Sequence, residues 1–219
     1  MTRADLRARV YDKLGLDSAE QTNLGVDATI NAYLNEAARY FCARAALSIG
    51  TGTITEVQNQ AFYDLPSDCI RIVALYRDDP AEKVWPVDDH TLDAERQNWR
   101  DSSGTPARAY LPFGMDEMAL NPIPSSSTET YTLYYVKDVG ETDLSADTST
   151  GTVPERYQDA LVRYAAARYA MRFGRGRKID RIARWMRGYL KQVRQAKRES
   201  QINVDMYHTV GPQHFVGGL

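Results

Sequence analysis

The chain has 219 residues, of which 43% are hydrophobic and 26% charged, which suits one large or two small globular domains. No run of about 18 apolar residues occurs, so we expect no membrane-spanning helix and no membrane partner. Residues 1–15 lack the apolar segment of a signal peptide, and two cysteines are too few for a disulfide framework, so we expect a protein made in the cytoplasm and not secreted.

The formal net charge of −2 conceals an uneven distribution of charge along the chain. The stretch from Arg163 to Arg198 contains thirteen Lys or Arg residues and one acid, Asp180, and so carries a net charge of +12. The other residues together carry −14. Asymmetry of this kind indicates a charged partner or an assembly surface.

Two helices are expected at the start of the chain. Residues 2–14 carry apolar side chains at a spacing of four and are followed by Gly15, which predicts an amphipathic helix that ends at this glycine. A second helix is expected to be capped by Asp27 and to run to about Ala45. Its apolar stripe is rich in alanine, so it should pack closely against the helix expected at 157–173.

The period of the apolar residues changes from about 3.6 to 2 after residue 49, which predicts about six short strands with antiparallel connections. Segments 51–57 and 61–65 flank a Gln-Asn-Gln turn and are predicted to form a hairpin. Asp88 and Asp89 are expected to cap a helix that runs to about Trp99. The acidic segment 137–151 is expected to be a flexible connection.

The next helix is predicted to begin near Thr152, because Thr152 and Glu155 form a capping-box pattern and Pro154 suits a first turn. Its apolar residues lie on two opposite faces, whereas a surface helix has one apolar stripe. We therefore expect a helix packed on both sides, inside its own domain or between its domain and a neighbouring chain. Its packing residues are expected to be Tyr157, Leu161, Tyr164, Tyr169 and Phe173.

A second, amphipathic helix is predicted from Lys178 to Arg198, with one apolar stripe and a basic opposite face. Like charges three or four residues apart repel, so a basic face without interleaved acids favours an anionic partner over a merely solvated surface. Nucleic acid, an acidic protein and the acidic remainder of a neighbouring copy all fit. The basic residues assigned to this surface are Arg177, Arg181, Arg184, Arg187, Lys191, Arg194 and Arg198.

Residues 199–219 show no consistent period but contain more apolar residues than a solubility tail needs. We expect an extended C-terminal arm that becomes ordered on a partner surface, with a frayed terminus as the alternative. The residues proposed for docking are Ile202, Met206, Tyr207, Phe215 and Leu219.

The order of these elements predicts an α+β fold, because strands and helices occur in separate runs. The expected architecture is a helical bundle, in which the N-terminal helices pack with two long C-terminal helices, with an inserted antiparallel β domain of about six short strands. The expected parts are 1–48 for the N-terminal helices, 49–151 for the β-rich insertion, 152–198 for the C-terminal helices and 199–219 for the arm.

No pattern of an active site or cofactor site is found in the sequence. Phosphate-binding glycine loops, dinucleotide fingerprints, nucleophile elbows and zinc-protease motifs are all missing from it. The three histidines, His90, His208 and His214, do not have the spacing of metal ligands. We therefore expect no catalytic residue, no cofactor and no metal, and we interpret Cys42 and Cys69 as small buried side chains.

An ordered set of short motifs resembles the head-to-tail adaptor (connector) proteins of tailed bacteriophages, over roughly residues 25–175. The motifs, in chain order, are AARYF at 37–41, FYDLPSD at 62–68, IRIVAL at 70–75, LNPIP at 120–124, YTLYY at 131–135 and VPERYQDAL at 153–161. The basic second helix and the long tail depart from the pattern of that family.

This resemblance implies a structural protein of the virion neck, assembled in the host cytoplasm, and not an enzyme. Such a protein forms a dodecameric ring that contacts the portal on one side and a tail or nozzle protein on the other. Double-stranded DNA passes through the ring. The basic helix would then lie at the ring interface or the channel, and the arm would dock on the portal. The alternatives are a basic-helix nucleic-acid-binding protein that is not part of a virion and, less well supported, an enzyme of phage entry or lysis.

Overall fold

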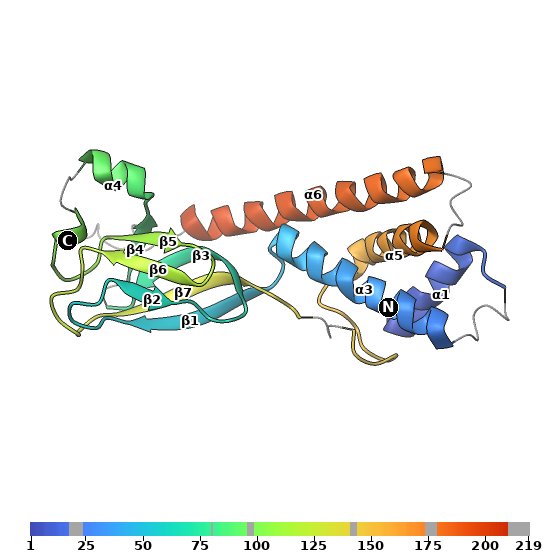
Figure 1. Ribbon diagram of the computed structural model, residues 1–219, viewed down its shortest axis with the longest axis horizontal. Helices are drawn as coiled ribbons and strands as arrows, with labels where there is room; N and C mark the ends of the chain where they lie inside the picture. The colour runs from blue at the N-terminus through green and yellow to red at the C-terminus, as the bar shows by residue number, and fades with distance from the viewer. Residues whose placement is uncertain (18–23, 80, 96–98, 141–143, 174–178, 210–219) are drawn as a thin grey trace, which may run out of the picture. The chain divides into compact units, whose positions relative to one another are not determined.

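The computed structural model describes residues 1–17, 24–79, 81–95, 99–140, 144–173 and 179–209. The chain divides into two compact units (Figure 1). Met1–Leu47 and Val139–Leu219 form the helical unit, and Ser48–Asp138 form the β unit. The segment 139–151, which was expected to belong to a flexible connection of the insertion, is thus part of the helical unit.

The helical unit begins with α1 (Arg3–Leu14), whose two ends are set by local signals. Thr2 and Asp5 form a capping box at its start, and Gly15 ends it in a left-handed conformation, with φ of 67°. The predicted helix at 2–14 and its end at Gly15 are therefore confirmed. The helix predicted to begin near Thr152 begins later, because Pro154 is the N-cap residue of a short 3-10 helix, η2 (Glu155–Tyr157), and caps it without a side-chain hydrogen bond.

Three longer helices complete this unit, namely α3 (Leu24–Ala45), α5 (Gln158–Arg172) and α6 (Ile179–Thr209). α5 contacts α1, α3 and α6, so its two apolar faces are both used within its own unit. Asp27 does not cap α3 as expected, because it lies inside the first turn, where it accepts a hydrogen bond from the Tyr11 hydroxyl.

The core of the helical unit combines large side chains from every one of these helices. Fully buried examples are Leu6 of α1, Phe41 of α3 and Leu161 of α5, and the ring of Tyr189 from α6 lies 6.1 Å from that of Phe41. Leu144, from the segment that follows the β unit, is also fully buried in this core. The acidic segment is consequently packed at this point, contrary to the expected flexible connection.

The β unit contains one seven-stranded sheet with the order β1-β7-β3-β4-β5-β6-β2 (Figure 1). The strands are β1 (Ile49–Thr55), β2 (Phe62–Asp64), β3 (Cys69–Arg77), β4 (Glu82–Pro86), β5 (Ala109–Phe113), β6 (Glu117–Asn121) and β7 (Thr130–Lys137). Between β4 and β5 the chain forms α4 (Asp89–Glu95) and a 3-10 helix, η1 (Trp99–Asp101). Asp88 caps α4 as predicted, with its Oδ1 2.7 Å from the Thr91 amide.

The sheet is curled, and the chain itself requires the curl. The two edge strands, β1 and β2, are joined only by residues 56–61. A flat sheet of seven strands would separate its edges by about 29 Å at the usual strand spacing. The connecting residues reach about 25 Å when fully extended. Register shifts in β3, between Cys69 and Arg71 and between Ile72 and Ala74, provide local bends.

The α+β composition is observed, but the expected architecture is wrong in several respects. The sheet has seven strands, and β4 pairs with β5 in parallel, so the β unit is not purely antiparallel. Segments 51–57 and 61–65 do not form a hairpin, because β1 pairs with β7 and β2 with β6. The C-terminal helices are not both long, since α5 has 15 residues and α6 has 31. The expected arm cannot be extended from residue 199, because α6 continues to Thr209.

Candidate functional site

Helix α6 is fixed to the helical unit along one side. Tyr189, Val193 and Ala196 are buried there, one or two turns apart, as a helix repeat of 3.6 residues requires. Two hydrogen bonds to α3 add to this contact. The Tyr189 hydroxyl donates to the Ala37 carbonyl oxygen at 3.3 Å, and the Ser200 hydroxyl donates to the Ala45 carbonyl oxygen at 2.6 Å. The opposite side of α6 therefore has a fixed orientation towards solvent.

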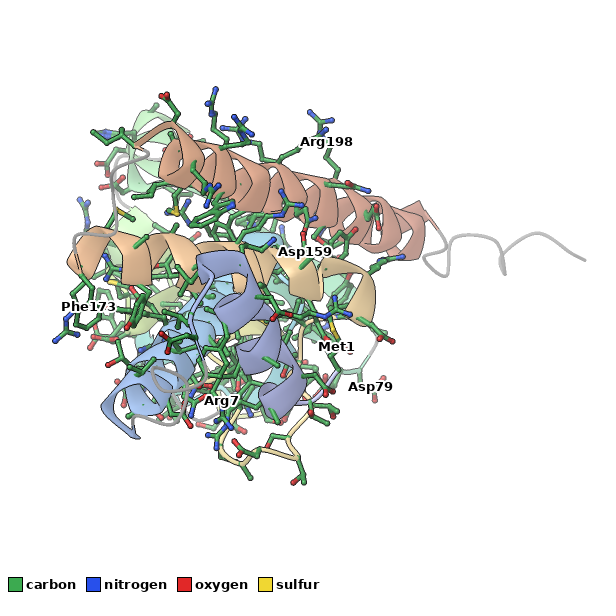
Figure 2. The ribbon with its side chains drawn as sticks, turned by 90° about the vertical axis from the view of Figure 1, so that its right-hand side faces the viewer. Met1, Arg7, Asp79, Asp159, Phe173 and Arg198 are labelled. Carbon is green, nitrogen blue, oxygen red and sulfur yellow. The ribbon has the colours of Figure 1, made fainter. Side chains whose placement is uncertain are left out.

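That opposite side is the basic face predicted from the sequence. Its described members all have exposed side chains, and among the described residues none of them forms an ion pair. They are Arg181, Arg184, Arg187, Lys191, Arg194 and Arg198. Figure 2 shows the labelled Arg198 on the outer side of α6. Arg177, also assigned to this surface, lies outside the described residues.

Other arginines of the same unit do have acidic partners. Arg163 pairs with Asp159 at 2.6 Å, one turn away on α5. Arg168 of α5 pairs with Glu36 of α3 at 3.2 Å. The basic face of α6 has an acid near each end, Asp180 and Glu199, but among the described residues neither forms an ion pair with its cations, since Glu199 pairs instead with Arg156 at 2.9 Å. Repulsion between its cations costs a few tenths of a kcal/mol per pair in isolated helices, so an anionic partner would relieve it.

The predicted packing residues in and beside α5 differ in how far they are buried. Tyr157, Leu161, Tyr164 and Tyr169 are buried in the helical unit, whereas Phe173, just after α5, is about half exposed (Figure 2). The Tyr164 hydroxyl donates to Glu36 Oε1 at 2.9 Å. Burial, followed by this carboxylate, raises the pKa of Tyr164, so the phenol stays protonated and remains a donor at neutral pH.

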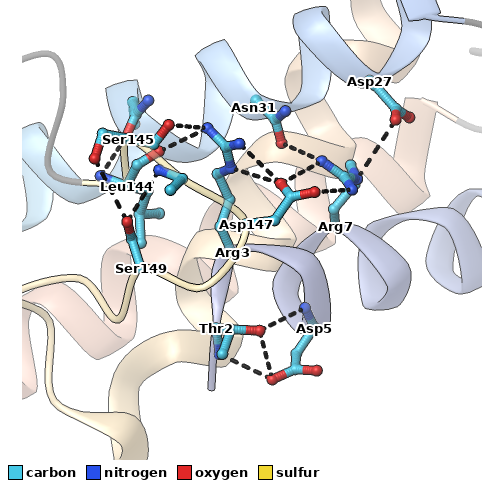
Figure 3. A network of polar contacts seen from close by, with 12 residues as sticks. Thr2, Arg3, Asp5, Arg7, Asp27, Asn31, Leu144, Ser145, Asp147 and Ser149 are labelled. Carbon is cyan, nitrogen blue, oxygen red and sulfur yellow. Dashed lines mark hydrogen bonds and ion pairs between the residues drawn. The ribbon is translucent and has the colours of Figure 1, made fainter.

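A cluster of charges fastens the segment after the β unit to α1 (Figure 3). Asp147 accepts hydrogen bonds from Arg3 at 2.8 Å and from Arg7 at 3.0 Å. These bonds, that of Arg7 first, lower the pKa of Asp147 to about 2. Arg3 also donates to the Leu144 and Ser145 carbonyl oxygens. The cluster is satisfied internally, so we interpret it as structural.

The residues proposed for the docking arm are only partly placed. Ile202, Met206 and Tyr207 lie within the backbone of α6. Phe215 and Leu219 lie outside the described residues. The backbone therefore presents the first part of the proposed arm as a continuation of the basic helix.

One surface of the β unit was not identified from the sequence. Phe62 of β2 and Phe113 of β5 are 47% and 56% exposed, and their rings lie 5.3 Å apart in an edge-to-face arrangement. Met115, in the turn between β5 and β6, is 74% exposed. These residues come from separate segments, so only strand pairing brings them together. The only signal in the sequence for this surface was weak: large apolar residues stand on both sides of Gly114, in a predicted turn, where side chains are usually exposed.

The described residues show no arrangement typical of a metal centre or a membrane span. Within them, no group of three or more His, Cys, Asp or Glu side chains could hold a metal ion. No helix in the described part of the chain is both long and apolar enough to cross a bilayer.

The family model described as "SU10 adaptor protein" matches residues 1–213, which is nearly the whole chain. No curated protein matches this sequence.

Proposed function

Because the chain belongs to the SU10 adaptor protein family, a family of structural phage proteins, we propose that it forms the ring that joins portal and tail in a tailed bacteriophage. In this proposal twelve copies surround the channel through which DNA leaves the capsid, in the neck of the virion. The ring is assembled in the host cytoplasm. The protein contacts the portal on one side and a tail or nozzle protein on the other.

The observation that carries this proposal is the exposed basic face of α6, whose described cations have no acidic partner. The two units of the chain carry opposite charge. Residues 48–138 contain 15 acids and 7 Lys or Arg, a net charge of −8, and the rest contains 14 acids and 20 Lys or Arg, a net charge of +6. A ring uses one surface on each copy to bind a different surface on the next. Opposite charges on the two units supply such a pair of surfaces.

The C-terminal part of the chain is proposed to contact the portal. Support comes from the apolar content of residues 199–219 and from the course of α6, which carries the chain as a helix to Thr209. In this arrangement the basic face binds the neighbouring subunit and the end of the same helix delivers docking residues to a different partner.

The basic face is proposed to have only a secondary role in contacting DNA. Each phosphate neutralised by a cation releases counterions and adds to affinity. A channel wall that bound DNA through every cation of α6 would hold the DNA back during ejection. We therefore assign most of these arginines to protein contacts.

Electron microscopy and mass measurement test the ring directly. The purified protein is examined alone and with the portal protein of the same phage, by negative stain and by native mass spectrometry. We expect rings with the mass of twelve copies in at least one of the two samples. Monomers in both samples would overturn the proposal.

The same basic face favours a second candidate, a dedicated nucleic-acid-binding protein. Titration of duplex DNA at several salt concentrations separates the two functions. A dedicated binder with six phosphate contacts would bind at micromolar or lower concentration and lose affinity with a log–log slope of about −5. We expect weak binding, which together with rings in the microscope would reject this candidate.

A further inference from the structure

The edge of the sheet around β2 carries an unusual combination of apolar and acidic residues, which we call the acidic–aromatic patch. Its members are Phe62, Asp64, Phe113, Met115, Asp116 and Glu117. In the sheet register Glu117 lies directly between Asp64 of β2 and Phe113 of β5. Side chains of paired residues point to the same face of a sheet, so these three form one row.

The neighbouring row of the same face is covered, whereas this row is not. Two residues along the strands, Leu111 and Ala119 are buried beneath Leu92 of α4. The cover ends there, and Phe62 and Phe113 are left about half exposed beside it. An exposed apolar surface next to a covered one is typical of a contact site for another molecule.

The acids of the patch repel one another, which destabilises the isolated chain. Asp64 and Glu117 are directly opposite each other on antiparallel strands, an arrangement in which like charges destabilise the pair. Both are exposed, as is Asp116, and among the described residues these three form no ion pair. A cationic partner would relieve this repulsion, whereas the phosphates of DNA would increase it.

A surface with the complementary character lies on the helical unit, where α5 ends and α6 begins. Met171 and Phe173 are about half exposed, and Ile179 is 78% exposed. The first cations of the basic face, Arg181 and Arg184, follow Ile179 within two turns of α6. We call these five residues the cationic end. It combines exposed apolar side chains at the end of α5 with exposed apolar and cationic side chains at the start of α6, where one exposed acid, Asp180, also lies.

We propose that the acidic–aromatic patch of one copy docks on the cationic end of the next copy. Phe62, Phe113 and Met115 then pack against the apolar residues of the cationic end, while Arg181 and Arg184 face Asp64 and Glu117. Because the two surfaces differ, the contact runs head to tail and repeats around a ring. The inference rests on the proposed ring and adds the identity of its subunit contact.

Charge reversal on either surface, and on both together, tests this contact in the full chain. One variant carries Asp64→Lys and Glu117→Lys, a second carries Arg181→Glu and Arg184→Glu, and a third combines all four changes. Sedimentation velocity and native mass spectrometry measure the fraction of protein in rings, with portal protein added if the wild type needs it.

We expect each double reversal to raise the protein concentration for half assembly by at least about tenfold. The combined variant should return to within about threefold of the wild type, because the opposed charges are exchanged. Glu117→Lys alone keeps the strand pairing, since it places opposite charges across β2 and β6, and is expected to weaken assembly without lowering the Tm. Asp12→Lys with Asp79→Lys, two exposed acids outside the patch, is the matched control for net charge.

The outcomes separate this inference from the proposed function. If the wild type forms rings and the reversals leave assembly unchanged, or the combined variant is not restored, the docking contact is rejected and the ring stands. If the wild type remains monomeric with and without portal, both are rejected. If each double reversal weakens ring assembly and the combined variant restores it, the pairing of the two surfaces is established.

Discussion

Asp147 is the residue through which the segment after the β unit is held against α1. Its carboxylate accepts hydrogen bonds from Arg7 and Arg3, which lower its pKa to about 2 (Figure 3). The segment was predicted to be flexible because its composition is polar and acidic. The contact could not be predicted from the sequence, because its partners lie some 140 residues away in the chain.

Replacement of Asp147 by Asn is expected to destabilise the protein above about pH 4 but not near pH 2. The folded-state pKa of about 2 lies below the ordinary value of 3.8, so the unfolded chain takes up the proton first as the pH falls. The carboxylate therefore contributes stability that is complete above about pH 4 and is lost towards pH 2. Thermal unfolding of wild type and variant, followed by circular dichroism between these pH values, measures the effect. A Tm difference independent of pH would contradict it, and Asp12→Asn on α1 is the control.

The hydroxyl of Tyr131 is expected to be the main hydrogen-bond donor that stabilises a buried acid in the β unit. Glu56 is fully buried, and its Oε1 accepts from the Tyr131 hydroxyl at 2.6 Å and from the Ala107 amide at 3.3 Å. Tyr131→Phe should lower the free energy of unfolding by about 1–3 kcal/mol, because a buried acceptor loses its best donor. Urea denaturation measures this, with Tyr134→Phe on the same strand as the control. Equal stability of the two variants would show that the hydroxyl is dispensable.

At the scale of elements, the pairing of β1 with β7 brings the ring of Tyr135 close to Gly50, a residue without a side chain. A Cβ atom at Gly50 would lie 2.6 Å from the ring of its register partner, Tyr135, whose hydroxyl donates to Asp68 at 2.9 Å. Gly50→Val is therefore expected to displace the ring, break that hydrogen bond and cost about 1–3 kcal/mol of stability. Thr53→Val, at an exposed site of the same strand, should cost little. Denaturant unfolding of both variants checks this, and a neutral Gly50→Val would refute the close approach.

The positions of helices and strands along the chain could be predicted better than the strands with which each strand pairs. Periodicity and capping signals located α1, the strand region and the basic helix, because these signals act within a few residues of chain. Segments 51–57 and 61–65 are close in sequence with a turn between them, which favours a hairpin. Each instead finds a longer partner strand more than 50 residues away, β7 or β6. Such pairing depends on packing over the whole sheet, which no local pattern records.

At the scale of the whole molecule, the charge distribution predicts that assembly depends on salt. The β unit carries −8 and the helical unit +6. Raising the ionic strength from about 0.01 M to about 1 M shortens the screening length from about 30 Å to about 3 Å. We expect the fraction of protein in rings to fall over this range, as measured by sedimentation velocity. An increase with salt would mean that apolar contacts dominate the interface and charge opposes it.

The two halves of the proposed contact differ in how far the sequence could reveal them. The basic face of α6 follows from spacings of three and four residues, so the sequence alone predicts it. The acidic–aromatic patch combines residues 62–64 with residues 113–117, and its register could not be known without the order of the strands. The extension of α6 to Thr209 was also missed, because the apolar spacing loses its regularity after Arg198.

The chain leaves and re-enters the helical unit at a single place, which has a consequence for how such a protein can diversify. The Lys137 amide donates to the Ser48 carbonyl oxygen at 2.9 Å, so the first and last residues of the β unit lie side by side. Leu47 and Val139, just outside the boundary, pack against the same core of the helical unit. Residues 48–138 are thus an inserted domain whose two ends lie next to each other. Recombination could replace this module with a larger or smaller one while the path of the helices is preserved, so new partners can be acquired without redesign of the scaffold.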